Sequence, residues 1–217
     1  MRNIYKYLLC FLLVFTIHEI IAQPFINEIK QFRKQDSLQK SPANAILFIG
    51  SSSFTMWKDV QEYFPDRTII NRGFGGSSLP HLIDYFDDIV KPYNPRQVVI
   101  YCGENDLTVD TIKPHHVLNR FTTLFSMIRQ NNPNVPVAFI SIKPSPSRAN
   151  LMRSMELSNQ LIREFLARQT NTQYINVYNE MLVNGKPNPT LFIGDNLHMN
   201  KQGYAIWQKK FEPHLLK

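Results

Sequence analysis

The chain has 217 residues, of which 43% are hydrophobic and 19% are charged. This composition is typical of a globular protein with a sizeable core, and it excludes a coiled coil or a disordered chain. The formal charge of +7 is not gathered into runs of more than two Lys or Arg residues and is not interleaved with aromatic residues, so we predict no nucleic-acid partner.

The first element in chain order is a predicted secretory leader. Two basic residues among the first seven precede an apolar run over residues 8–17, which is too short to favour a spanning helix. Ala22 offers a small residue at a cleavage point. We therefore predict a signal peptide over residues 1–22, a secreted or periplasmic mature protein of charge +6, and no stable membrane insertion after cleavage. Ile20 fits the cleavage pattern poorly, so an uncleaved anchor is the alternative.

Residues 23–217 are predicted to form a single domain. Pro24–Lys40 has the apolar spacing of an amphipathic helix. Strand-like apolar runs follow at Ala45–Ile49, Thr68–Asn71, Gln97–Cys102, Pro136–Ile142 and Gln173–Val177. Helical spacing is found over Leu79–Val90, His115–Gln130, Ala149–Gln169 and Gly203–Leu216, and Trp57, Val60 and Phe64 predict one further helix after the first strand. Such alternation indicates an α/β fold with a parallel sheet and helices on both faces.

Residues with chemical potential follow the strands. In a parallel sheet, ligands bind outside the carboxyl ends of the strands. Four segments lie at these positions or in the long loop after the fifth strand: Gly50-Ser-Ser-Ser53, Asn71-Arg-Gly-Phe-Gly-Gly-Ser-Ser78, Gly103-Glu-Asn-Asp106 and Asp195-Asn-Leu-His198. We predict that they meet at one edge of the sheet, with Ser52 as a nucleophile at a helix entrance.

Each segment also has an ordinary structural interpretation. Ser51 and Ser53 are typical helix caps or surface residues. The glycines after the second strand and Asn105 are common in turns. Asp195 and His198 could form an unremarkable loop pair, and they are too few to bind a metal. The neighbouring His115 and His116 stand at a predicted helix start and are not expected to bind a metal, so we predict no metal and no cofactor.

The cysteines indicate no disulfide framework. Cys10 falls in the predicted leader, so Cys102 would be the one cysteine of the mature chain. It lies in an apolar run, where a small buried hydrophobic residue is favoured over a cysteine nucleophile.

Together, the four segments resemble in order and spacing the sequence blocks of the SGNH hydrolase superfamily, also called GDSL esterases. The chain is most similar to the branch that resembles the platelet-activating factor acetylhydrolase catalytic subunits. The resemblance extends from about residue 45 to residue 207. It implies a three-layer α/β/α sandwich, flavodoxin-like, with a five-stranded parallel sheet. One departure is Ser51, where the family has Asp.

The resemblance also implies a set of site residues. Ser52 corresponds to the nucleophile, His198 to the base and Asp195 to the acid that orients the imidazole. The oxyanion hole would consist of the backbone N–H groups of Ser52 and Gly76 and the side-chain amide of Asn105. This acyl-transfer chemistry needs no cofactor.

The substrate prediction is a short acyl ester, such as an acetyl ester of a small alcohol or a glycan. The expected pocket walls show no long apolar segment for a lipid tail; they are Phe54, Phe74, Leu79, Leu107, Lys143–Arg148 and Pro187–Phe192. Arg148 was expected to be a surface loop residue, with a grip on an anionic substrate group as the alternative. The rival enzyme functions are a lysophospholipase and an acyl-thioesterase, and a rival of another class is a non-catalytic glycan-binding module. No particular oligomeric state is predicted.

Overall fold

The computed structural model describes residues 24–217, so the predicted leader over residues 1–22 lies outside the described residues. The main sheet consists of β1 (Ile46–Gly50), β2 (Ile69–Gly73), β3 (Gln97–Tyr101), β4 (Val137–Ile140) and β5 (Thr172–Ile175). All neighbouring strands are parallel, in the order β2-β1-β3-β4-β5. The predicted five-stranded parallel sheet is confirmed, with strand ends displaced by one or two residues.

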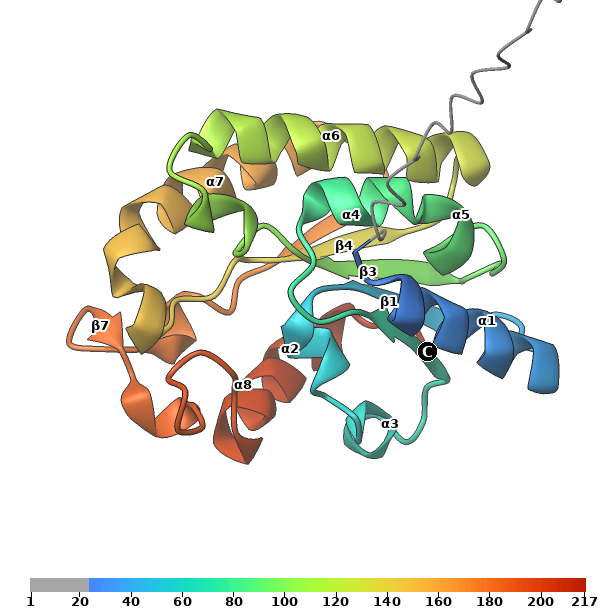
Figure 1. The fold of residues 1–217 in the computed structure, drawn as a ribbon, viewed down its shortest axis with the longest axis horizontal. Helices are drawn as coiled ribbons and strands as arrows, with labels where there is room; N and C mark the ends of the chain where they lie inside the picture. Colours follow the sequence, from blue (N-terminus) through green and yellow to red (C-terminus); the bar gives the residue numbers. More distant parts are fainter. Residues whose placement is uncertain (1–23) are drawn as a thin grey trace, which may run out of the picture.

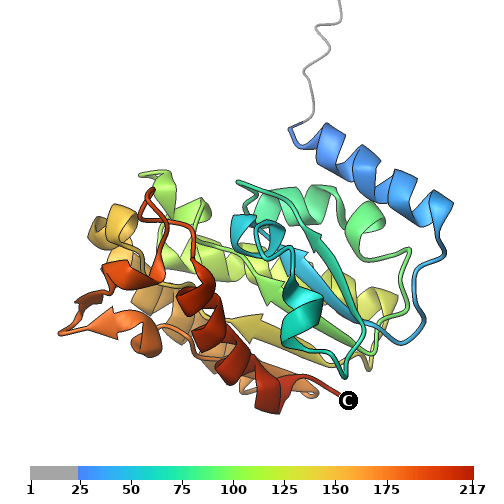
Figure 2. The ribbon, with the colours of Figure 1, turned by 90° about the horizontal axis from the view of Figure 1, so that it is seen from below.

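Helices cover both faces of this sheet (Figure 1). One layer contains α1 (Ile26–Leu38), α4 (Leu79–Asp84), α5 (Phe86–Ile89), α6 (Pro114–Asn131) and α7 (Met152–Leu166). The other contains α2 (Ser52–Thr55), α3 (Val60–Tyr63) and α8 (Lys201–Phe211), with α8 lying in front of the sheet in Figure 2. The remaining elements are a hairpin, β6 (Leu182–Val183) with β7 (Lys186–Pro187), and five 3₁₀ helices: η1 (Asp106–Thr108), η2 (Pro146–Leu151), η3 (Asn179–Met181), η4 (Pro189–Leu191) and η5 (Glu212–His214).

The three layers follow from side-chain alternation along the strands. Successive residues of β1 point to opposite faces, so Leu47 and Ile49 join the core beneath α4 to α7, whereas Ile46 and Phe48 join the core beneath α2, α3 and α8. All five residues of β1 are buried. This two-sided burial explains why the strand is a continuous apolar run rather than an alternating one. The predicted α/β/α sandwich is thereby confirmed.

Two predicted helices are each divided in two. The segment after β1 forms α2 and α3, because the chain makes 3₁₀-type turns between them, with the Trp57 N–H donating to Phe54 O at 3.1 Å. Trp57 and Phe64 are nevertheless fully buried, as their spacing predicted. Leu79–Val90 is interrupted at Tyr85, whose φ of −100° and ψ of 16° are not helical. The spacing of apolar residues shows which face of a segment is buried. Two short helices joined by a turn can bury that face as well as one continuous helix, so the spacing does not distinguish them.

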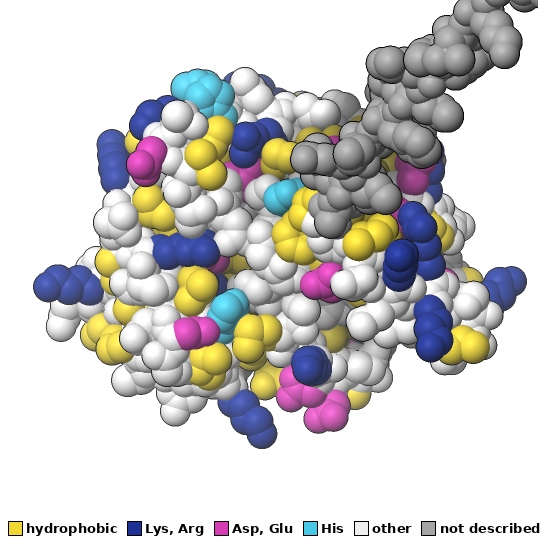
Figure 3. All heavy atoms as spheres, in the orientation of Figure 1, with side chains coloured by type: hydrophobic (Ala, Val, Ile, Leu, Met, Phe, Trp, Pro, Cys, Tyr) yellow, Lys and Arg dark blue, Asp and Glu magenta, His cyan; other side chains and the backbone are white. Residues whose placement is uncertain are grey.

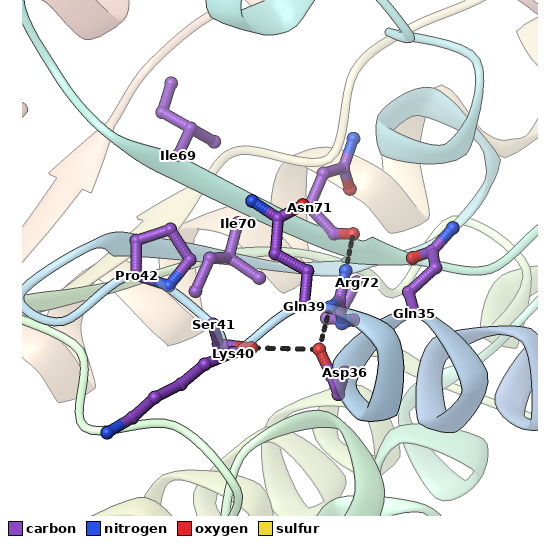
Figure 4. Close-up of a pocket in the computed structure, with 10 residues that line it drawn as sticks. All are labelled: Gln35, Asp36, Gln39, Lys40, Ser41, Pro42, Ile69, Ile70, Asn71 and Arg72. Atoms are coloured by element: carbon purple, nitrogen blue, oxygen red, sulfur yellow. Dashed lines mark hydrogen bonds and ion pairs between the residues drawn. The ribbon is translucent and has the colours of Figure 1, made fainter.

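A polar cluster fastens α1 to the edge strand β2 (Figure 4). Arg72 donates to Asp36 Oδ1 at 2.6 Å, and the Tyr93 hydroxyl donates to Asp36 Oδ2 at 2.5 Å. The Ser41 hydroxyl donates to the same carboxylate at 2.9 Å. A hollow of about 310 Å³ lies over this cluster. Since these polar groups already bind one another, we interpret the cluster as the anchor of α1. Within residues 24–217, no helix has the length and apolar character to cross a membrane.

Candidate active site

The turn from β1 to α2 presents one serine. Gly50 ends β1 with a φ of 152°, and a Cβ atom there would lie 2.0 Å from the carbonyl oxygen of Tyr101 in β3. Only glycine therefore lets the ends of β1 and β3 lie this close together. Ser52 is the first residue of α2 and is partly exposed. Ser51 and Ser53 are each only 2% exposed, so of the two expectations for them, helix cap or surface residue, the surface position is wrong. Ser51 does stand at the helix N-cap position, but its side chain makes no capping hydrogen bond. Ser52 is therefore the serine that a substrate can reach.

The segment after β2 lies against this turn. Gly50 O accepts hydrogen bonds from the Phe74 N–H at 2.9 Å and from the Ser77 hydroxyl at 3.2 Å. Gly76, between these two anchors, has a φ of 80°, which glycine adopts without strain. Among residues 24–217, the turn and loop hydrogen bonds do not use the N–H of Ser52 or of Gly76. Both N–H groups thus remain available to a ligand.

Asn105 joins the segments that follow β2 and β3. Its side-chain Nδ2 donates at 2.8 Å to the carbonyl oxygen of Ser77, the residue that follows Gly76 in the chain. Its Oδ1 accepts from Arg148 Nη2 at 2.9 Å. The neighbouring Asp106 is 1% exposed and accepts from the Leu79 N–H at 3.0 Å, which ties the same two segments together a second time. An amide nitrogen carries two hydrogens, so Asn105 retains one donor beyond its bond to Ser77.

Asp195 and His198 form a close pair in the long loop before α8. Their side chains meet at 2.6 Å between Nδ1 of His198 and Oδ2 of Asp195. The backbone N–H groups of Leu197 and His198 each donate to Asp195 Oδ1 at 2.9 Å. Burial would raise the pKa of Asp195, but the hydrogen bonds from His198 and Leu197 outweigh it and lower that pKa to about 2. The ionised carboxylate holds Nδ1 and leaves Nε2 of the ring for other contacts.

A buried cluster of charged side chains lies against the turn that connects Asp195 to His198. The Glu104 carboxylate accepts from Lys143 Nζ at 3.1 and 3.2 Å and from the Tyr101 hydroxyl at 2.6 Å. Lys143 Nζ also donates to Leu197 O at 2.9 Å. The side chains of Lys143 and Glu104 are only 1% and 5% exposed. Burial lowers the pKa of the Lys143 ammonium, and the adjacent Glu104 opposes that shift.

Sequence reasoning missed part of this arrangement. Arg148 is not the free surface residue that was expected, because its side chain is 18% exposed and binds Asn105 and Glu104. Glu104 was not assigned a role and Lys143 was expected only as part of a pocket wall, although both follow strands at the carboxyl edge of the sheet, where the signal could have been found. The supposed pocket walls Phe54, Phe74 and Leu79 are fully buried and Leu107 is 4% exposed, so all four belong to the core.

Phe25 is a further unpredicted neighbour of the site. It lies just before α1, and its ring packs edge-on against that of Phe74 with 5.2 Å between the centroids. A Cβ atom placed on Gly76 would lie 3.7 Å from Phe25 Cε1. The start of the described chain therefore borders the segment that carries Gly76.

A cysteine nucleophile finds little support here. Cys102 is fully buried, and burial together with the nearby Asp106 carboxylate raises the pKa of its thiol well above the usual range. This opposes a cysteine nucleophile. Within the described part of the chain, no group of three or more His, Cys, Asp or Glu side chains is placed to hold a metal ion. In the view of Figure 3, Lys and Arg side chains are scattered among other types rather than gathered on one area.

The fold and the sequence blocks at its carboxyl edge define an ester hydrolase. The chain belongs to the GDSL-like lipase/acylhydrolase family, whose family model matches residues 48–206. The predicted superfamily is thereby confirmed. Comparison with curated proteins gives no significant match.

Solved structures with the same fold include one provisionally described as a platelet activating factor from Streptococcus pneumoniae, with a TM-score of 0.76, 21% identity, and coverage of 88% of this chain and 92% of its own. A GDSL-like lipase from Bacteroides thetaiotaomicron has a TM-score of 0.71, 20% identity, and coverage of 85% and 95%. A mutant acetyl-xylooligosaccharide esterase from Geobacillus has a TM-score of 0.61, 15% identity, and coverage of 81% and 95%. At these identities the likeness concerns the fold.

Proposed function

We propose that the protein is an exported serine esterase that hydrolyses short acyl esters, above all acetyl esters of carbohydrates. Ser52 is the nucleophile, His198 the general base and Asp195 the residue that orients the imidazole. The oxyanion hole consists of the N–H groups of Ser52 and Gly76 and the side-chain amide of Asn105.

In the proposed mechanism, His198 Nε2 takes the proton of the Ser52 hydroxyl as Oγ attacks the ester carbonyl carbon. The carbonyl oxygen becomes an oxyanion held by the three N–H donors. His198 then gives its proton to the departing alcohol, which leaves an acyl group on Ser52. Water, deprotonated by the same imidazole, then attacks the acyl carbon. The bond from this carbon to Ser52 Oγ breaks, the imidazolium returns its proton to Oγ, and the carboxylic acid leaves. The Asp195 carboxylate stabilises the imidazolium at each step.

The observation that carries the proposal is the 2.6 Å contact between His198 Nδ1 and Asp195 Oδ2. A carboxylate with a pKa of about 2 stays ionised at neutral pH and fixes the tautomer in which Nε2 is free to accept a proton. The partial exposure of Ser52, between two buried serines, supports its assignment as nucleophile.

The polar surroundings of Asn105 support a substrate with a short acyl group and a polar alcohol. The contacts there are the charged Arg148 and the main-chain oxygen of Ser77, and the apolar side chains once expected as pocket walls lie in the core. Among proteins of the same fold is an acetyl-xylooligosaccharide esterase, which offers an analogy for a glycan substrate. Export rests on the signal-peptide pattern of residues 1–22.

The test compares p-nitrophenyl acetate, acetylated xylan, a long-chain p-nitrophenyl ester and a lysophospholipid as substrates. We expect release of acetate and little turnover of the two lipid-like substrates. Ser52→Ala is expected to abolish hydrolysis, whereas Ser51→Ala and Ser53→Ala, the matched controls, retain it. Preference for the long-chain substrates would favour a lysophospholipase, and binding of glycan without hydrolysis of any ester would refute the enzyme mechanism. N-terminal sequencing of the exported protein tests cleavage after Ala22.

A further inference from the structure

The buried ion cluster of Tyr101, Glu104, Lys143 and Arg148 takes no part in the chemistry of the proposed mechanism. Glu104 Oε1 and Oε2 accept from Lys143 at 3.2 and 3.1 Å, Oε2 accepts from Tyr101 at 2.6 Å, and Oε1 lies 3.5 Å from Arg148 Nη1. Taking such a pair of charges out of water costs free energy that their attraction only partly offsets, and apolar replacements are often as stable. Stability of the fold alone is therefore a poor explanation for these charges.

Two branches of the cluster reach the proposed catalytic machinery. Arg148 Nη2 donates to Asn105 Oδ1 at 2.9 Å, on the side of the oxyanion hole. Lys143 Nζ donates to Leu197 O at 2.9 Å, inside the turn that connects Asp195 to His198. The Ser147 N–H also donates to Asn196 O at 3.0 Å, so the loop after β4 holds this turn at two neighbouring carbonyls. Glu104 thus links the two halves of the site through one carboxylate.

The orientation of the Asn105 amide follows from these donors. Arginine has no acceptor, so only the oxygen end of the amide can face Arg148. The nitrogen end must then point away from it, with one N–H on Ser77 O and the second free. Rotation of the amide by 180° would place its N–H groups against a cation and its oxygen against a carbonyl, which is doubly unfavourable. Arg148 thereby selects the rotamer that an oxyanion hole requires.

We propose that Arg148 and Lys143, joined through Glu104, are positioning residues of the esterase: Arg148 fixes the donor end of Asn105 toward the oxyanion, and Lys143 holds the Asp195–His198 turn in place. This inference rests on the proposed function. It replaces the idea that Arg148 grips an anionic substrate, because both of its terminal nitrogens face Asn105 and Glu104 and its side chain is largely buried.

The test is a double-mutant cycle on the full chain with the neutral substrate p-nitrophenyl acetate. Arg148→Met is expected to lower kcat at least about 10-fold with a change in KM below about twofold, since a misoriented donor weakens transition-state binding rather than substrate binding. Arg148→Lys, which keeps a donor and a charge, should recover part of the loss. In an Asn105→Ala background, either Arg148 substitution should slow turnover by less than about twofold, because the group it positions is gone. Arg153→Met is the matched control, as Arg153 is 78% exposed and pairs with Glu156 at the surface.

Three results would overturn the proposal. Effects of Arg148 and Asn105 that multiply in the double mutant would show that Arg148 acts independently of Asn105. With an anionic ester assayed beside p-nitrophenyl acetate, a rise in KM confined to the anionic ester would make Arg148 a substrate-binding residue. Unchanged kcat in both Arg148 variants would remove it from catalysis. If Arg148→Met does not fold, the double-mutant cycle with Asn105→Ala is measured with Arg148→Lys, which retains the positive charge.

The Lys143 branch has its own readout. Lys143→Met removes the hydrogen bond to Leu197 O and leaves the Glu104 carboxylate in contact with Tyr101 and Arg148, and we expect slower labelling of Ser52 by a fluorophosphonate, as the base is displaced. Labelling at the wild-type rate would refute the role of Lys143. Failure of the proposed function is separable from both results: it would be seen as ester hydrolysis that survives Ser52→Ala, or as no hydrolysis by the wild-type protein.

Discussion

Replacing Asn105 by alanine tests the oxyanion hole with a magnitude that follows from its contacts. The side chain makes two hydrogen bonds in the folded protein, from Nδ2 to Ser77 O and from Arg148 to Oδ1, and it retains one free N–H. Losing one preorganised oxyanion donor raises the barrier by about 3–4 kcal/mol. We therefore expect kcat for p-nitrophenyl acetate to fall roughly 100- to 1,000-fold.

The same substitution should have a much smaller effect on folding. It leaves Ser77 O and part of the Arg148 guanidinium without their partner, at a cost of about 1–3 kcal/mol. For a chain of this size, such a loss lowers the melting temperature by roughly 2–4 °C per kcal/mol. At 25 °C the variant should remain folded while it is nearly inactive.

The assay combines kcat and KM measurements with thermal unfolding followed by circular dichroism. Asn105→Asp is the matched variant, because it keeps the shape and the contact with Arg148 but places a negative charge beside the developing oxyanion. We expect it to be at least as slow as Asn105→Ala. A fall in kcat below about 10-fold for Asn105→Ala would place this amide outside the oxyanion hole. A fall matched by loss of the folded population would show that the residue is structural.

Three further predictions concern other groups. Iodoacetamide should neither label Cys102 in the folded protein nor reduce activity, since the buried thiol has a raised pKa; rapid inactivation would contradict this. Asp195, whose pKa is lowered to about 2, contributes stability at pH values above its ordinary pKa, and this contribution is lost as pH falls from about 4 toward 2; denaturant titrations that give the same stability at pH 4 and pH 2 would contradict this. Gly50→Ala should lower stability by more than about 3 kcal/mol in denaturant titration, because steric overlap with Tyr101 adds to backbone strain; Gly194→Ala, which has open space, serves as the control.

The order of elements could be predicted from the sequence because the central strands β1, β3 and β4 are buried on both faces. Such strands are read directly as apolar runs, and their parallel arrangement fixes which residues reach the carboxyl edge. This argument placed Ser52 and Asn105 at that edge without any knowledge of side-chain contacts, and the resemblance to the GDSL esterases implied the predicted role of Asn105. The contact between Asp195 and His198 depends only on local spacing, since the two residues between them lie in one tight turn.

The ion cluster could not be predicted in the same manner. Lys143 and Glu104 are 39 residues apart in the sequence, and Arg148 and Asn105 are 43 residues apart. No local sequence pattern predicts contacts over such separations. A basic residue in a loop is usually solvated, which is why Arg148 was assigned to the surface. Burial of these charges becomes visible only when the layers of the fold are assembled.

The hairpin of β6 and β7 is a different case, because a local signal was present. Asn184 and Gly185 both have positive φ values, of 51° and 74°, and they separate the two short strands. An Asn-Gly pair between two strands is the usual sequence of a type I′ turn. Each strand has only two residues, however, which is too short for an alternating pattern to be recognised.

The central claim is that Ser52 is made nucleophilic by the imidazole of His198. The most direct measurement is covalent labelling of the wild-type protein and of His198→Ala with a fluorophosphonate, followed by mass-spectrometric mapping of the modified residue. The account predicts one label, on Ser52, in the wild-type protein and a rate of labelling at least about 100-fold slower in His198→Ala. A label on Ser51 or Ser53, or equal labelling rates in the two proteins, would contradict it.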